Sequence, residues 1–200
     1  MKKIIVIAIL AFVLTASLFA GYIGVEAGAG LNLRDIKIRN DEGEYVKKYS
    51  DEIYFISVTA IGEIMDYMNE IGFGGEVTFE KPISWVRYNK DVDVSSYPLK
   101  IRELCAYAIF PSGIYYTSTF NVDGGLFYRV ESLASQVGGQ RIHTIGAMGK
   151  FEYVFDNPSF VVPRIGVKIK VPLLTFASND TRVITDGISL SAYLTVGFGE

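Results

Sequence analysis

Apolar and polar residues alternate through the last part of the chain, from Gly187 to Phe198. One face carries Ile188, Leu190, Ala192, Leu194, Val196 and Phe198, and the other carries Ser189, Ser191, Tyr193, Thr195 and Gly197. Side chains of a β-strand point alternately to its two faces, so this pattern predicts a strand with one apolar face. A strand that crosses a bilayer needs about 9–11 tilted residues, and this segment is long enough to do so.

The same alternation predicts seven earlier strands, at residues 22–34, 52–63, 71–80, 101–110, within 114–130, 142–155 and 160–173. The prediction for 101–110 is the weakest, because Cys105, Tyr107 and Ile109 are almost as apolar as the residues between them. Long polar connections follow the first, third, fifth and seventh strands, at residues 35–51, 81–100, 131–141 and 176–186, and the others are short. Membrane barrels have such long outer loops and short periplasmic turns. The fold class predicted is all-β, an eight-stranded antiparallel up-and-down transmembrane β-barrel with both termini at the short-turn end.

The first 20 residues have the composition of a secretory signal peptide rather than of the barrel. Lys2 and Lys3 precede an apolar run, and small residues follow it up to Ala20. We predict a signal peptide at residues 1–20, with Ser17 as the alternative cleavage position, and a barrel domain at residues 21–200. A retained anchor is the alternative, although the apolar run is short for a helix that needs about 20 residues to span a bilayer.

Charge and cysteine content narrow the classes of function. Without Lys2 and Lys3, 17 basic residues face 22 acidic residues, which argues against nucleic acid as a partner. Cys105 is the only cysteine, so no internal disulfide can stabilise the exported chain. A lone cysteine and a lone histidine cannot make a zinc site, so we predict neither a metal nor a cofactor.

The signal peptide, the eight alternating strands, the alternating loops and the aromatic last strand resemble a known class. They are similar to the small eight-stranded outer-membrane barrels of diderm bacteria, the OmpA/OmpX/OmpW-like superfamily. This resemblance implies location in the outer membrane. It also implies that the segment from Gly187 to Phe198 is read by the outer-membrane insertion machinery, whose signal ends in an aromatic residue; here Gly199 and Glu200 follow Phe198.

The polar faces of the predicted strands carry charges that would point into the barrel. The candidate lumen network consists of Glu26, Glu76, Asp123, Arg129, Lys150, Glu152, Arg164, Lys168 and Lys170. Eight strands leave an interior just wide enough for side chains, so these charges must pair, with Glu63 as a further acidic partner. A structural plug of ion pairs is the first interpretation, and a narrow polar conduit or ligand cavity is the second.

Other residues raise further hypotheses. Pro163 and Pro172 interrupt the seventh strand and are expected near its two rims or at bulges, because proline cannot donate to the ladder. Aromatic residues near strand ends are expected to form interfacial girdles; they are Tyr22, Phe79, Tyr128, Phe155, Phe160 and Phe198. His143 lies near Ser132, Ser135, Glu131 and Thr144, which would suit a lipid-modifying enzyme with histidine as general base, although no family spacing is matched. We interpret it as a rim residue.

The predicted function is a structural or adhesin-like surface role, exerted through the outer loops of a monomer. Its partners would be outer-membrane lipid, the insertion machinery and an extracellular molecule. A narrow channel or transporter for small solutes is the alternative. More remote alternatives are a lipid-modifying enzyme and a soluble periplasmic lipocalin-like binding protein, whose barrel would turn its apolar face inward.

Overall fold

A computed structural model describes residues 21–40, 42–66, 71–87, 98–111, 120–133, 141–155, 161–177 and 183–198. Its strands are β1 (Gly21–Arg39), β2 (Tyr45–Asp66), β3 (Ile71–Arg87), β4 (Pro98–Pro111), β5 (Phe120–Leu133), β6 (Arg141–Val154), β7 (Val161–Ala177) and β8 (Val183–Phe198). The predicted signal peptide lies outside the described residues. Within those residues, no helix is long and apolar enough to cross a membrane.

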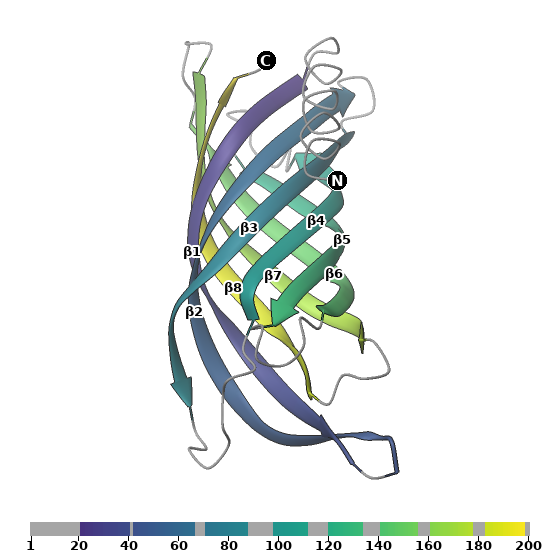
Figure 1. Ribbon diagram of the computed structural model, residues 1–200. Helices are drawn as coiled ribbons and strands as arrows, with labels where there is room; N and C mark the ends of the chain where they lie inside the picture. Colours follow the sequence, from purple (N-terminus) through teal and green to yellow (C-terminus); the bar gives the residue numbers. More distant parts are fainter. Residues whose placement is uncertain are drawn as a thin grey trace, which may run out of the picture.

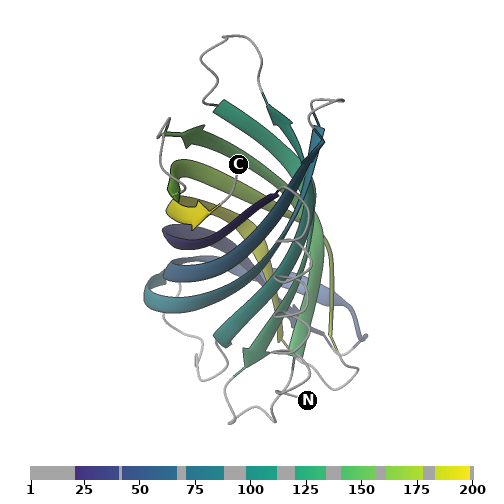
Figure 2. The same cartoon turned by 90° about the horizontal axis from the view of Figure 1, so that it is seen from above.

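The strands form one closed barrel in which every strand pairs antiparallel with its neighbours in the chain (Figure 1, Figure 2). The barrel closes where β1 pairs with β8, from Ile23 opposite Phe198 to Ile38 opposite Val183. This ladder leaves no open edge between the first and last strands, as a membrane barrel requires. The predicted fold, an eight-stranded antiparallel up-and-down barrel, is confirmed.

The two faces of the barrel differ in chemistry as the alternation predicts. On β8, Leu194 is 50% exposed on the outer surface, whereas the next residue, Thr195, is 0% exposed in the interior. The exposed large apolar side chains come from all eight strands, and charged side chains are buried inside. Soluble barrels have the opposite arrangement, since they bury their apolar face. The barrel is therefore transmembrane, and its apolar outer surface contacts lipid.

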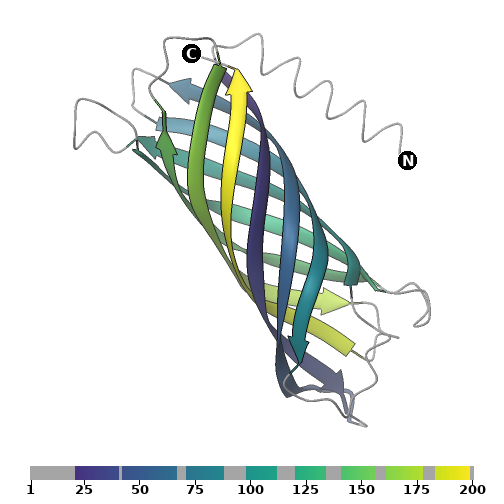
Figure 3. The same cartoon turned by 90° about the vertical axis from the view of Figure 1, so that its left-hand side faces the viewer.

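Several strands are longer than the sequence predicts. Residues 35–51, predicted to be a loop, are mostly strand, and the β1–β2 hairpin projects beyond the other strands at the end opposite the C-terminus (Figure 1, Figure 3). A tight turn closes the hairpin, in which Asn40 Oδ1 accepts a hydrogen bond from the Glu44 amide at 2.8 Å and Gly43 has φ of 88°. Charged residues on both faces hide the strand periodicity here, so the loop prediction was wrong.

The weakest predicted strand is present as β4, and its inner face is partly apolar. Cys105, Tyr107 and Ile109 point inward and pack with Phe127 and Met148. The alternation is ambiguous because this part of the barrel interior is itself apolar. The interior thus combines a small hydrophobic cluster with a larger charged region.

The β7–β8 ladder ends before the two strands do. Its last pair is Lys170 with Ser189, although β7 continues to Ala177 paired with β6, and β8 starts at Val183 paired with β1. Pro172 lies just beyond this last pair, and Leu173 is the extra residue of a bulge against β6. Proline has no N–H to donate, so it suits a position where the ladder stops. Pro163 pairs with Val196 near the start of β7, so both prolines lie at the positions expected for them.

The β3–β4 ladder ends in the same way on the other side of the barrel. Its last pair is Glu80 with Ile101, and β3 continues to Arg87 paired with β2. Pro82 lies just beyond the last pair, and Ile83 is the extra residue of a bulge against β2. The barrel wall is therefore continuous near the termini and split at two places toward the opposite end.

Candidate functional site

The barrel interior holds most of the charge that the membrane-spanning strands carry. Among the described residues, nine acidic side chains and six basic side chains are buried. The acidic residues are Glu26, Asp51, Glu63, Glu76, Glu80, Glu103, Asp123, Glu131 and Glu152. The basic residues are Arg34, Arg129, Lys150, Arg164, Lys168 and Lys170. Because an unpaired buried charge is very costly, the arrangement of these groups decides what the interior can do.

Two basic residues form ion pairs with the acidic cluster that lies nearest the termini. Lys150 Nζ lies 3.2 Å from Asp123 Oδ2, 3.3 Å from Glu152 Oε1 and 3.7 Å from Glu63 Oε1. Arg164 Nη1 donates to Glu63 Oε2 at 2.5 Å and to Glu152 Oε2 at 3.3 Å. The cluster draws its members from β2, β5, β6 and β7, so it links strands across the interior.

Tyrosine hydroxyls and rings complete the same cluster. The Tyr107 hydroxyl donates to Glu63 at 2.7 Å, and the Tyr193 hydroxyl donates to Glu152 at 3.0 Å. Lys150 Nζ also lies 4.3 Å from the centre of the Tyr107 ring, a distance typical of a cation–π contact. The Tyr107 ring covers Gly74, where a Cβ would collide with it. A glycine at this point of β3 is therefore needed for the close approach of the ring.

Lys168 is the centre of the middle cluster. Its ammonium donates to Glu26 at 3.0 Å and to Glu76 at 2.8 Å, and Thr59 donates to Glu26 at 3.2 Å. These residues come from β7, β1, β3 and β2. One lysine of β7 thus binds two carboxylates from β1 and β3, the two strands that flank β2.

A third cluster lies toward the split end of the barrel. Lys170 pairs with Glu103, and Arg129 Nε donates to the other oxygen of Glu103 at 2.9 Å. Arg34 binds Glu131 through two parallel hydrogen bonds of 2.6 Å each, the bidentate geometry that makes arginine–carboxylate pairs strong. The three clusters follow one another along the barrel, and their side chains fill an interior that eight strands leave narrow.

The structure places every residue of the candidate lumen network in the interior. The sequence reasoning did not pair Arg34, Glu80, Glu103 and Glu131, which are buried in the third cluster. Arg34 and Glu80 lie in the predicted strands 22–34 and 71–80, on the same faces as Glu26 and Glu76, so the alternation contained the signal for them. Glu103 lies in the strand with ambiguous faces, and Glu131 was assigned to a loop.

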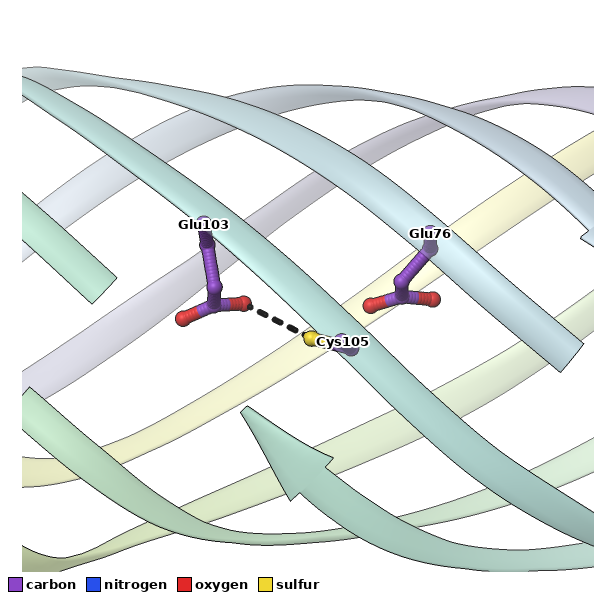
Figure 4. A group of neighbouring side chains, drawn as sticks. All are labelled: Glu76, Glu103 and Cys105. Carbon is purple, nitrogen blue, oxygen red and sulfur yellow. Dashed lines mark hydrogen bonds between the residues drawn. The ribbon is translucent and has the colours of Figure 1, made fainter. Parts of the chain in front are cut away.

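Two groups of side chains have the composition of metal ligands. Glu76, Glu103 and Cys105 form one group, and Glu63, Asp123 and Glu152 form the other, with ligand atoms within 4.8 Å of one another in each. Figure 4 shows the first group, in which the Cys105 thiol donates to Glu103 at 3.4 Å. Sequence alone did not associate Cys105 with these carboxylates. Lys168 binds Glu76 and Lys170 binds Glu103, so ammonium groups already neutralise the first group.

His143 does not contact Glu131 or Thr144, the carboxylate and one of the hydroxyl groups near it in the sequence. It lies on the outer face of β6, where its Nδ1 is 2.6 Å from the Tyr128 hydroxyl and its ring stacks on Phe176. Glu131 and Thr144 are buried in the interior, on the other face of the wall. Ser132 and Ser135 have no described side chains. The rim interpretation fits this aromatic setting, and the proposed general-base arrangement is not formed by the described residues.

Most aromatic residues expected in the girdles are exposed on the outer surface. They are Phe79, Tyr128, Phe155 and Phe198. Tyr22 is the exception, because it is 3% exposed and its ring lies 3.5 Å from the Arg164 guanidinium carbon. It shares the inward face of Glu26 on β1, so its assignment to a girdle was wrong. Phe160 lies outside the described residues.

No family model matches the chain, and no curated protein matches it. Among solved structures, Neisserial surface protein A (NspA) is similar with a TM-score of 0.53 and 16% identity, covering 88% of this chain and 97% of the other. The attachment invasion locus protein Ail of Yersinia pestis has a TM-score of 0.39 and 11% identity, covering 88% and 97%. An outer-membrane channel from Pseudomonas putida F1 has a TM-score of 0.34 and 13% identity, covering 90% and 96%. The similarity to NspA supports the eight-stranded barrel fold.

The location of the protein follows from the chemistry of its two faces. A closed, even-numbered antiparallel barrel with an apolar outer band and a polar interior is the architecture of outer-membrane proteins. The chain is an outer-membrane β-barrel of a diderm bacterium, as the sequence predicts. The β1–β2 hairpin lies opposite the end where β8 terminates (Figure 1), and the β3–β4 and β7–β8 ladders stop short of the hairpin end.

Proposed function

We propose that the protein is a surface-interaction protein, whose filled barrel anchors the β1–β2 hairpin outside the membrane. The observation that carries this proposal is the length of these strands: β1 has 19 residues and β2 has 22. A tilted strand crosses the hydrocarbon core with about 9–11 residues. Roughly half of each strand therefore extends beyond the apolar band and offers a rigid surface for an adhesin-like contact.

The filled interior supports an anchoring role over passive transport. Interior side chains from β1 to β8 are joined in ion-paired clusters, and the larger ones are nearly inaccessible to solvent. Conductance measurements in planar bilayers should show no discrete channel steps. Steps that persist in purified protein would contradict the filled-lumen proposal and favour the narrow-channel alternative.

The hairpin proposal is tested by shortening β1 and β2 together. Replacing residues 37–48 with Asn-Gly, a favoured two-residue hairpin turn, removes the outer part of the hairpin and keeps Ile36 opposite Tyr49, so the register of the membrane-spanning strands is unchanged. Cells that display this variant should lose adherence to a panel of immobilised matrix proteins and glycans. The control shortens the β5–β6 connection instead, and both variants must keep the heat-modifiable band of a folded barrel. Equal adherence of the two variants would contradict the proposal.

We further propose that the protein acts as a monomer and that the insertion machinery recognises the segment from Gly187 to Phe198. The continuous ladder of β1 with β8 supports the first point, because the barrel closes without a second chain. The exposed aromatic residue at the end of β8 supports the second. Removal of Phe198 should slow assembly into the outer membrane, measured by the rate at which the heat-modifiable band forms.

A further inference from the structure

A cleft of about 670 Å³ opens where β7 separates from β8. Val171, Pro172 and Leu173 of β7 line one side. The other side is formed by parts of β8, β1 and β2 that include Ile188 and Leu33. The cleft lies on the part of the wall where the β7–β8 ladder has ended, so it follows from the backbone arrangement and not from a chance gap between side chains.

The cleft opens toward the membrane. Leu33, Val171, Leu173 and Ile188 belong to the outer, lipid-facing positions of their strands, and their exposed fractions are 48%, 37%, 67% and 43%. Leu33 pairs directly with Ile188 across the β1–β8 ladder. A continuous apolar surface therefore leads from the lipid-contacting band into the cleft. A chain of methylene groups entering from the bilayer would stay in apolar surroundings.

Two residues beyond Leu33 along β1, the lining of the cleft becomes acidic. Leu33 is opposite Glu52 of β2, and Asp35, the next outward residue of β1, is opposite Ser50. Asp35, Asp51 and Glu52 line this part of the cleft together with one basic residue, Lys37. Asp35 accepts a hydrogen bond from Ser50 at 2.8 Å, and Glu52 accepts one from Tyr54 at 3.3 Å.

The second split of the barrel differs in charge. Beside the end of the β3–β4 ladder, the exposed charged residues among the described side chains are Lys81 and Arg102, both basic. The same backbone arrangement thus carries positive charge at one split and mostly negative charge at the other. A charged molecule at the membrane surface would distinguish the two.

We propose that the β7–β8 cleft binds a membrane amphiphile with a cationic head group. Its acyl chain lies against Leu33, Leu173 and Ile188, and its ammonium group contacts Asp35 and Glu52. The apolar part of the lining faces lipid, and the acidic part lies farther out, where the head groups of the bilayer begin. This order matches the order of chain and head group in a lipid. The site is independent of the hairpin function proposed above.

The test measures association of two spin-labelled probes with the protein reconstituted in phosphatidylcholine vesicles. The probes are a long-chain amine and a long-chain carboxylic acid that differ only in the charge of the head group. Electron paramagnetic resonance reports the fraction of each probe whose motion the protein restricts. We expect the amine to associate about tenfold more strongly than the acid, because two carboxylates attract one and repel the other.

Three variants locate the binding. Ile188→Trp fills the apolar part of the cleft and should reduce amine association to that of the acid. The double substitution D35N/E52Q keeps hydrogen-bond acceptors but removes the charges, and should lower amine association about tenfold. Leu194→Trp is the matched control, on the same face of β8 but outside the cleft, and should leave association unchanged.

The control for folding is the heat-modifiable band, which each variant must retain. Equal association of the two probes with the unchanged protein would overturn the proposal. Wild-type amine association in both Ile188→Trp and D35N/E52Q would overturn it as well, because the amine would then bind elsewhere on the barrel. Loss of association in Leu194→Trp as strong as in Ile188→Trp would show general lipid contact and not a site.

Discussion

The barrel near the termini and the barrel toward the hairpins are built from the same strands but are held together differently. Near the termini every strand has two hydrogen-bonded neighbours, and β8 pairs with both β1 and β7. Toward the β1–β2 hairpin, β8 remains paired with β1 but no longer with β7, and β3 remains paired with β2 but no longer with β4. The wall thus becomes two four-stranded sheets, one made of β8, β1, β2 and β3 and the other of β4 to β7.

The difference shows that alternation of side chains and continuity of the ladder are set by different features. Outward apolar residues continue past both splits, as Ile188 and Leu173 do at the β7–β8 split. The last paired residues of the two ladders, Glu80 and Lys170, lie two residues before Pro82 and Pro172, and each proline is followed by a bulge. Alternation therefore indicates which face of a strand contacts lipid, and proline marks where a strand stops pairing with one of its two neighbours.

The largest expected effect comes from removing a buried positive charge in the continuous part of the barrel. Lys168→Met would leave Glu26 and Glu76 buried without their cation. We expect the free energy of unfolding in lipid vesicles to fall by about 3–5 kcal/mol, the usual cost of breaking a buried ion pair by removing one partner. Guanidinium titration followed by tryptophan fluorescence measures it.

The control for this prediction replaces the carboxylates as well as the lysine. Lys168→Met combined with Glu26→Gln and Glu76→Gln removes the whole charged group. This variant should recover much of the lost stability, because no uncompensated charge remains. A single substitution with no effect would mean that water or another cation reaches the interior.

A smaller effect on stability is expected to distinguish two depths in the membrane on the outer face of β8. Leu194 lies in the continuous part, and Ile188 lies beside the split. Leu194→Lys should destabilise the folded barrel by about 2–4 kcal/mol, as expected for lysine near mid-bilayer, whereas Ile188→Lys should cost about 0–1 kcal/mol near the interface. Unfolding in vesicles measures both. Equal costs would mean that the split end lies within the hydrocarbon core.

Much of this organisation could be predicted from the sequence, and the exceptions have physical causes. Period-2 alternation identifies a strand wherever one face meets lipid, so β8 and the lipid-facing part of β1 were predicted with correct faces. Beyond the membrane both faces meet water, and alternation disappears, as it does between Asp35 and Asp51. Inside the barrel, pairing depends on which strands lie across from each other. Charge pattern alone could not join Arg34 to Glu131, which are 97 residues apart.

The smallest expected effect concerns the proline that ends the β7–β8 ladder. Pro172→Val supplies an N–H in a strand-forming residue, and β7 can then extend its ladder toward the start of β8. Amide hydrogen exchange at residues 183–188 should slow by about two- to tenfold, the equivalent of one net hydrogen bond. Pro163→Val is the control, because Pro163 already lies opposite Val196 in a continuous ladder and its replacement should leave exchange at 183–188 unchanged. Unchanged exchange in both variants would mean that the bulge at Leu173, and not the missing N–H, keeps the two strands apart.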